Sequence, residues 1–141
     1  MATPGLLNRR YMLDTNMVSF IVRDQFEPLK RRLRDVAPSS LCISAITQAE
    51  LLHGLARKPG ATALRAKVNG VLLRIESLPW DGLAAQSYAT LRAAMESQGQ
   101  GLANFDNLIA AHALALGHVL VSNDQAFRRV TGLLVEDWTS D

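Results

Sequence analysis

The sequence FDNLIAAHALALGHVLVSND, which runs from Phe105 to Asp124, joins a predicted helix to a predicted strand and decides the fold class. Residues 108–116 are apolar almost all round apart from His112, a pattern that indicates a buried helix. Gly117 is the glycine expected after a helix, and the apolar run 119–121 between polar residues indicates a short buried strand. We therefore expect a helix over residues 105–116 that begins close to a sheet.

Working outward from this stretch, short apolar runs alternate with helical patterns along the whole chain. Strands are expected at residues 11–13, 41–43, 75–78, 119–121 and 133–135, and helices at residues 15–22, 27–35, 45–57, 61–74, 82–97 and 105–116. Apolar strands separated by helices indicate a parallel sheet covered on both faces. The expected fold class is therefore α/β, with three layers and a short parallel sheet flanked by helices. Such sheets bind ligands beyond the carboxyl ends of their strands.

Composition sets limits without deciding the function. A chain of 141 residues suits one domain, and its formal net charge of +2 is only weak evidence for a polyanionic partner. Cys42 is the only cysteine, which excludes a disulfide within the chain and a thiolate metal cluster, and its apolar neighbours indicate a small buried hydrophobe. The N-terminus lacks a secretory pattern and no apolar run reaches the roughly 18 residues of a membrane span, so we expect a cytoplasmic protein without membrane contact.

Four acids carry the functional argument, although each also has an ordinary structural explanation. Asp14 follows the first strand, where it could cap the next helix, and Asp124 follows the strand 119–121, where it suits a turn. Glu50 lies within a helix, where a lone glutamate is usually solvated, and Asp106 lies in a first helical turn, where the helix dipole favours an acid. Taken singly, none of them establishes a site.

Taken together, the four acids predict a metal site. Four carboxylates in one crevice repel one another and raise each other's pKa, so a cation has to sit between them. Oxygen ligands suit Mg²⁺ or Mn²⁺, and such an ion polarises a phosphoryl oxygen and supplies a hydroxide-like water for in-line attack. Hydroxyl and amide groups beside the acids are expected to orient them by hydrogen bonds: Thr15, Asn16, Ser122 and Asn123.

Several segments of the chain resemble, in order and spacing, the PIN domains of VapC-type toxins. The resemblance is carried by residues 11–16, 43–54, 105–113 and 120–124, and also by residues 78–81 and 130–138. It implies a single PIN-like nuclease domain over residues 1–141, with residues 1–10 as an N-terminal extension. It further implies a Mg²⁺- or Mn²⁺-dependent endoribonuclease toxin that cuts tRNA or another structured RNA. Such a toxin forms a homodimer and is neutralised by a VapB-type antitoxin within a higher complex.

The resemblance also assigns the site residue by residue. Asp14, Glu50 and Asp106 fall on the family's acidic positions, and Asp124 falls on a position where relatives carry Asp or Asn. Ser122 departs from the family, where Thr is common. Residues 102–104 depart as well, because a stretch containing Gly and Pro is more usual there. Neither departure touches an acid, but the second bears on substrate fit at the edge of the cleft.

Other features keep two interpretations. The basic residues of the helix 27–35 either contact RNA phosphates or an acidic part of the antitoxin, or form a solvated face: Lys30, Arg31, Arg32 and Arg34. His53 and His112 are more readily core or cleft-edge histidines than acid–base groups. A phosphatase with Asp14 as nucleophile is disfavoured, because Asn16 stands where a second acid would be needed. A PIN scaffold that binds RNA or a protein without cutting remains the alternative function.

Overall fold

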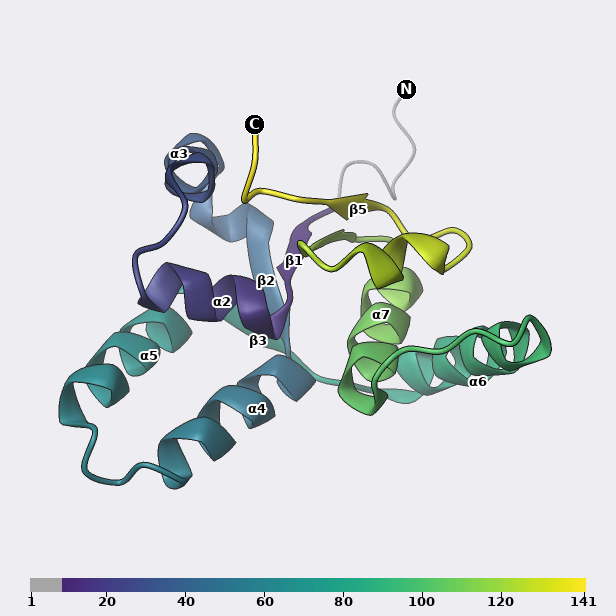
Figure 1. Cartoon of the computed structure of the whole chain (residues 1–141), viewed down its shortest axis with the longest axis horizontal. Helices are drawn as coiled ribbons and strands as arrows, with labels where there is room; N and C mark the ends of the chain where they lie inside the picture. The colour runs from purple at the N-terminus through teal and green to yellow at the C-terminus, as the bar shows by residue number, and fades with distance from the viewer. Residues whose placement is uncertain (1–8) are drawn as a thin grey trace.

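The structure is a computed structural model that describes residues 9–141, and five parallel strands form its central sheet (Figure 1). The strands are β1 (Tyr11–Leu13), β2 (Leu41–Ser44), β3 (Glu76–Leu78), β4 (Val119–Val121) and β5 (Val135–Glu136). Their order is β3-β2-β1-β4-β5, so β1 pairs with both β2 and β4 in the middle of the sheet. Residues 1–8 of the expected N-terminal extension lie outside the described residues.

Six α-helices and two short 3-10 helices connect and cover these strands. The α-helices are α2 (Thr15–Val22), α3 (Glu27–Asp35), α4 (Ala45–Ala56), α5 (Thr62–Arg74), α6 (Gly82–Ser97) and α7 (Asn104–Leu116), and the 3-10 helices are η1 (Pro38–Ser40) and η2 (Gln125–Arg129). In Figure 1, α2, α4 and α5 lie on one side of the sheet and α6 and α7 on the other. The expected three-layer α/β fold is confirmed.

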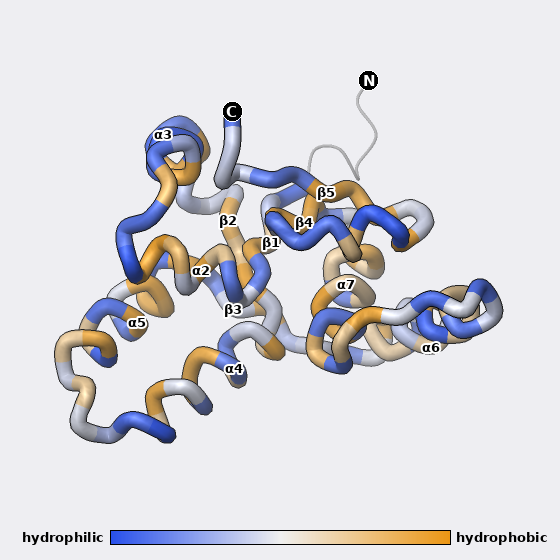
Figure 2. The backbone as a smooth tube through the Cα atoms, viewed as in Figure 1, coloured by the Kyte–Doolittle hydropathy of each residue, from blue (hydrophilic) through white to orange (hydrophobic). Residues whose placement is uncertain are grey.

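Two cores, one on each face of the sheet, explain why the strands are apolar throughout. Leu13, Ile43 and Val121 point into the core that α2, α4 and α5 cover. Their strand neighbours Met12 and Leu120 point into the core that α6 and α7 cover. Because successive side chains of a strand face opposite sides of the sheet, a strand that is buried on both faces is apolar at every position. Figure 2 shows the resulting hydrophobic strands inside hydrophilic loops.

The end of α7 and the cysteine agree with the expectations. Gly117 follows the helix with a φ of +67°, a left-handed conformation that favours glycine. Cys42 is fully buried in β2, and burial raises the pKa of its thiol to about 11, so it stays a neutral, small apolar side chain. Across the described residues, no helix is both long and apolar enough to span a membrane.

The last strand and the segment after β4 differ from the expectations. The strand expected at residues 133–135 is wrong in position, since β5 covers Val135–Glu136. The reason is the turn before it: Gly132 has a φ of +84° and Leu133 N–H bonds back to the carbonyl of Val130, so Leu133 is still in the turn. The 3-10 helix η2 was not expected from the sequence, because five residues carry no helical periodicity.

Candidate active site

Asp14 lies at the carboxyl edge of the sheet, between the ends of β1 and β4. Its backbone N–H donates to the carbonyl of Val121 at 3.1 Å, which fixes the two strand ends side by side. Its side chain is only 4% exposed, and one carboxylate oxygen accepts a 2.8 Å hydrogen bond from the N–H of Met17. The Ser122 hydroxyl also hydrogen-bonds to this carboxylate. Asp14 therefore caps α2, as the structural interpretation held, while standing in the crevice where a ligand is expected.

Glu50 reaches the same place from α4. Ser44, the last residue of β2, caps this helix through a 3.1 Å bond from the N–H of Ile46, so α4 starts at the carboxyl edge. Glu50 is half-buried, and its Oε1 accepts a 2.5 Å hydrogen bond from the Thr15 hydroxyl. A glutamate on a solvated helix face would have no such partner. The side chain is instead directed toward the start of α2, next to Asp14.

Asp106 and Asp124 approach from the opposite side of the crevice. Asp106 lies in the first turn of α7 and is half-buried. Asp124 is exposed, and one of its carboxylate oxygens accepts a 2.9 Å bond from the N–H of Ala126, which caps η2. The predicted turn or cap role of Asp124 is thus present as well. Its exposure sets it apart from Asp14 in the same crevice.

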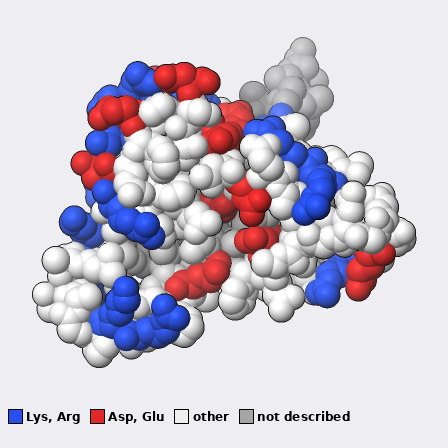
Figure 3. Space-filling model, in the orientation of Figure 1, with Lys and Arg blue, Asp and Glu red and all other residues white. Residues whose placement is uncertain are grey.

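The charges of neighbouring acids act on both Asp14 and Asp106. The pKa of Asp14 is raised from 3.8 to about 6, mainly by burial and also by the charges of Asp106 and Asp124, against hydrogen bonds that lower it. Burial likewise raises the pKa of Asp106, with the charges of Asp124 and Glu50 adding to the effect. Figure 3 shows acidic side chains gathered in the middle of this face, with Lys and Arg over the end of α4 and over η2 on either side.

The donor set fits a hard divalent cation. Within residues 9–141, no three His, Cys, Asp or Glu side chains stand close enough to enclose a metal ion by themselves. Magnesium does not need such a cage, since it keeps several waters and is usually held by one or two carboxylates. The crevice supplies carboxylates, and the raised pKa values of Asp14 and Asp106 mean that their ionised forms lack a compensating positive charge. A bound cation would provide that charge.

The predicted orienting residues divide into two pairs. Thr15 and Ser122 hydrogen-bond to the carboxylates of Glu50 and Asp14, respectively. Asn16 is exposed and Asn123 half-buried, and among the hydrogen bonds of the described residues neither amide contacts an acid of the site. The structure therefore brings the hydroxyl groups to the acids but not the amides.

Sequence reasoning missed Thr47. This residue is fully buried in the first turn of α4, three residues before Glu50, and its hydroxyl lies 3.2 Å from that of Thr15. The spacing of three residues puts the side chains of Thr47 and Glu50 on one helix face, but the contact with Thr15 depends on how closely α2 approaches α4. Thr47, Thr15 and Glu50 form a continuous chain of side-chain contacts between α4 and α2.

The two histidines have different surroundings. His112 is buried; its Nδ1 lies 2.7 Å from Oγ of Ser44, and its ring also hydrogen-bonds to the carbonyl of Pro79. It is a satisfied core histidine, as the favoured interpretation held. His53 is exposed on α4 and lines a hollow beside Glu50, which places it at the cleft edge.

The basic residues of α3 lie away from the acids and are mostly paired. Arg32 donates a 2.7 Å bond to Glu136 and lies 4.8 Å from the ring centre of the buried Trp138. Arg31 pairs with Asp141, and Lys30 with Asp24 and Glu27. These contacts anchor the C-terminal segment and the α2–α3 loop, so they favour a structural role for this helix face over RNA binding.

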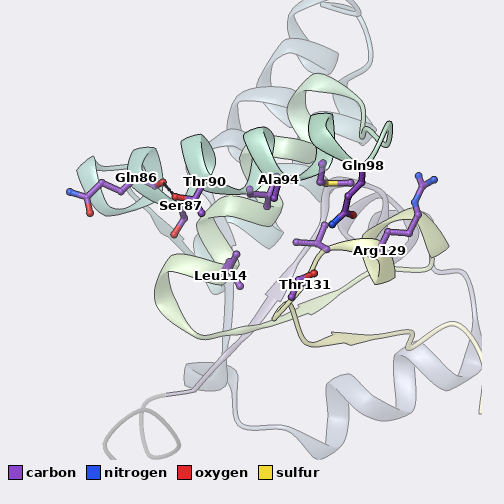
Figure 4. Close-up of a pocket in the computed structure, with 11 residues that line it drawn as sticks. Gln86, Ser87, Thr90, Ala94, Gln98, Leu114, Arg129 and Thr131 are labelled. Atoms are coloured by element: carbon purple, nitrogen blue, oxygen red, sulfur yellow. Dashed lines mark hydrogen bonds between the residues drawn. The ribbon is translucent and has the colours of Figure 1, made fainter.

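A second hollow, of about 540 Å³, lies between α6 and the segment around η2 (Figure 4). Figure 4 shows Thr90 and Ala94 of α6 across from Leu114 and Thr131. Arg129 is the charged residue in its lining, and none of the four acids borders it. It is therefore separate from the acidic crevice.

Comparison with known proteins agrees with this geometry. The PIN domain family model matches residues 11–133. The tRNA(fMet)-specific endonuclease VapC of Shigella flexneri is 33% identical over 92% of this chain and 98% of its own length. The Ribonuclease VapC2 of Haemophilus influenzae is 32% identical with the same coverage. The crystal structure of DNA-bound VapBC from Salmonella typhimurium superimposes with a TM-score of 0.86 and 34% identity, over 92% of this chain and 98% of that chain. The chain, with its acids at the carboxyl edge of a five-stranded parallel sheet, belongs to the PIN-domain family and, within it, to the VapC-type ribonucleases.

Proposed function

We propose that this protein is a toxin-type endoribonuclease that needs Mg²⁺ or Mn²⁺, held among Asp14, Glu50, Asp106 and Asp124, with one or two of these carboxylates bound directly and the others acting through coordinated waters. One observation carries the proposal: acids from separate parts of the chain gather at the carboxyl edge of the sheet, where burial and the charges of neighbouring acids raise the pKa of both Asp14 and Asp106. PIN-domain VapC nucleases generally depend on a divalent metal, which agrees with this crevice.

The side chains of the crevice have separable tasks in this mechanism. Asp14 and Asp106, both withdrawn from solvent, supply the negative charge that holds the cation in place. Thr15 fixes the direction of the Glu50 carboxylate, and Ser122 that of Asp14. Asp124, which is exposed, is placed to accept a hydrogen bond from the attacking water or from the ribose. When bound, the divalent ion polarises the scissile phosphate and lowers the pKa of a coordinated water.

The partners follow from the same family membership. The relative from Shigella flexneri is named for the tRNA that it cuts, and the related structures from Salmonella typhimurium and Rickettsia felis are VapBC complexes. We extend these properties to this chain: its substrate is tRNA or another structured RNA, and a VapB-type antitoxin neutralises it. We also place a homodimer at the centre of that complex, and the whole assembly in the cytoplasm.

The test is cleavage of purified tRNA by the full chain in the presence of Mg²⁺ or Mn²⁺. We expect new RNA ends at one or a few positions, loss of cleavage in EDTA, and recovery when Mn²⁺ is added in excess. The control is Asp35→Asn, an exposed acid at the end of α3 outside the crevice, which should cut at the wild-type rate. RNA binding without cleavage at any divalent ion concentration would support the non-cutting scaffold instead.

A further inference from the structure

A small hollow of about 350 Å³ lies directly beside the acids, between α4 and the start of α7. Its lining is Ala49, Glu50, His53, Gly54, Arg57 and Phe105. Glu50 thus belongs to both the acidic crevice and this hollow, and Phe105 precedes Asp106 in the chain. Whatever occupies the hollow is in contact with the edge of the metal-binding crevice.

Phe105 is an exposed aromatic residue that belongs to neither hydrophobic core. Its side chain is 53% exposed, and in the described part of the chain no other aromatic ring pairs with it, whereas Phe20 pairs with Phe26 and Tyr11 with Trp138. An exposed phenylalanine forgoes the stabilisation that burial of its ring would give. An exposed ring beside a phosphate-cleaving site is suited to stacking with a base, because every base has a π-face.

The opposite wall of the hollow is basic. Ala49, His53 and Arg57 follow one another at intervals of four residues, so they share one face of α4. Arg57 is exposed and has no ion pair within residues 9–141, and Lys58 follows it. Figure 3 shows this positive group at the end of α4, next to the acidic middle of the face. A cation that lines the same hollow as Glu50 suits a neighbouring phosphate of a chain whose scissile phosphate lies in the crevice.

Gly54 leaves the floor of the hollow open. A methyl group added at this glycine would meet no atom within 4 Å, and the residue lines the hollow although it lies inside a helix. A larger side chain would start in this open space, so it would reduce the hollow without a clash at its Cβ.

We propose that this hollow binds the base of a nucleotide next to the scissile bond, with Phe105 stacking on the base and Arg57 contacting the following phosphate. This inference rests on the proposed ribonuclease function and names the subsite that places the RNA. A volume of about 350 Å³ lies within the range of small-ligand sites. A single-stranded nucleotide fits better than a paired one, because its base is free to leave the stack.

The test uses short oligoribonucleotides that contain the mapped cleavage position, either intact or abasic at each of the two nucleotides that flank the cut bond. Wild type should show a KM about tenfold to a hundredfold higher for one abasic substrate, with little change in kcat. Phe105→Ala should raise KM for the intact substrate by a similar factor and become insensitive to that abasic position. Phe105→Tyr should behave as wild type, and Leu73→Ala, at an 89% exposed leucine on α5, should change nothing.

A second variant separates binding from folding. Gly54→Leu should raise KM while the melting temperature stays equal or increases, because leucine is the better helix former. An Arg57→Gln variant should weaken binding of both the intact and the abasic oligonucleotides and make binding less dependent on salt.

Three results would overturn the inference. One is an unchanged KM in both Phe105→Ala and Gly54→Leu. Another is an equal effect of Phe105→Ala on intact and abasic substrates, which would mean that the ring does not contact a base. The last is a Phe105→Ala variant that has an unchanged KM but a lower oligomeric state in light scattering. That result would mean that the hollow is a protein interface. Anisotropy binding of single-stranded oligoribonucleotides, intact or abasic at each position in turn, keeps the two proposals apart: base-dependent binding without cleavage would contradict the nuclease function and leave the subsite standing.

Discussion

The hydroxyl of Thr15 donates a 2.5 Å hydrogen bond to Oε1 of Glu50, and this bond joins the first turn of α2 to the second turn of α4. Thr47 also contacts Thr15, because its fully buried hydroxyl lies 3.2 Å from the Thr15 hydroxyl. The Glu50 carboxylate is therefore held by the protein itself at Thr15, the residue that follows Asp14. Because the protein already holds this carboxylate in position, a cation that binds does not have to order the Glu50 side chain.

Removal of the Thr15 hydroxyl should lower the affinity for the metal ion more than it lowers the stability of the folded protein. We expect Thr15→Val to lower the cleavage rate about tenfold to a hundredfold and to shift the Mg²⁺ midpoint upward, because Glu50 loses its partner. Thr15→Ser keeps a hydroxyl and should remain close to wild type. The measurement is the single-turnover cleavage rate across a Mg²⁺ titration, and an unchanged midpoint in Thr15→Val would disprove the orienting role.

Asp14 should make the metal-free protein less stable as the pH rises. Its folded pKa of about 6 exceeds the ordinary value of 3.8, so the folded state holds the proton more tightly than the unfolded state does. The stabilisation by this proton is complete below pH 4 and is lost as the pH rises through 6. The difference corresponds to about 3 kcal/mol at neutral pH.

The matched variant is Asp14→Asn, because asparagine caps a helix about as well as aspartate. Urea unfolding in EDTA should show it to be more stable than wild type at pH 7.5, by up to about 3 kcal/mol, with the gap closing toward pH 4. A variant that is less stable than wild type at pH 7.5 would mean that the buried charge is already compensated.

The contact of His112 with Ser44 should produce the opposite pH dependence. The Ser44 hydroxyl oxygen accepts the N–H of Ile46, so its proton is free to bond to Nδ1 of a neutral imidazole. Burial lowers the pKa of His112, against the raising effects of Asp81 and of the Pro79 carbonyl. Because the folded pKa lies below the unfolded value of 6.5, stability is full above pH 6.5 and is lost as the pH falls below it.

His112→Ala therefore should lose most at neutral pH. We expect a loss of about 2 kcal/mol or more at pH 7.5, from the missing ring and its two hydrogen bonds, and a smaller loss at pH 5. The comparison is the difference between variant and wild-type unfolding free energies at the two pH values, which removes the contribution of Asp14. A loss that does not change with pH would show that the imidazole is not held neutral.

Asp124 should matter less than Asp106. It is exposed and caps η2, whereas Asp106 is half-buried among the other acids. We expect Asp124→Asn to retain cleavage within about tenfold of wild type, since the amide still caps η2 and accepts a hydrogen bond. Asp106→Asn should lose more than about a hundredfold, beyond the usual effect of an orienting residue. Equal rates for the two variants would contradict the division of roles.

The sequence predicted the sheet well where a strand is short, apolar and ended by a clear signal. Val119–Val121 is such a case, with Gly117 before it and Ser122 after it. The prediction failed at residues 133–135, because apolar residues fill the turn after Gly132 as well as the strand, and periodicity does not distinguish the two.

The acids of the site were predictable from the sequence, as were the hydroxyl groups of Thr15 and Ser122 that contact them. An acid directly after a strand, such as Asp14, is recognisable because a parallel sheet brings strand ends to one edge. Thr47 was not, because its role depends on how closely α2 approaches α4, which is a property of packing rather than of local sequence. The same holds for the hollow at Phe105, whose walls come from two helices that are far apart in the chain.

Calorimetric titration of the metal-free protein with Mn²⁺, on wild type and Asp106→Asn in parallel, tests the shared metal site most directly. The account predicts saturable binding to wild type over the concentration range in which RNA cleavage appears, and loss of that binding in the variant while its circular dichroism spectrum is unchanged. Wild-type affinity for Mn²⁺ in Asp106→Asn, together with wild-type cleavage, would contradict it.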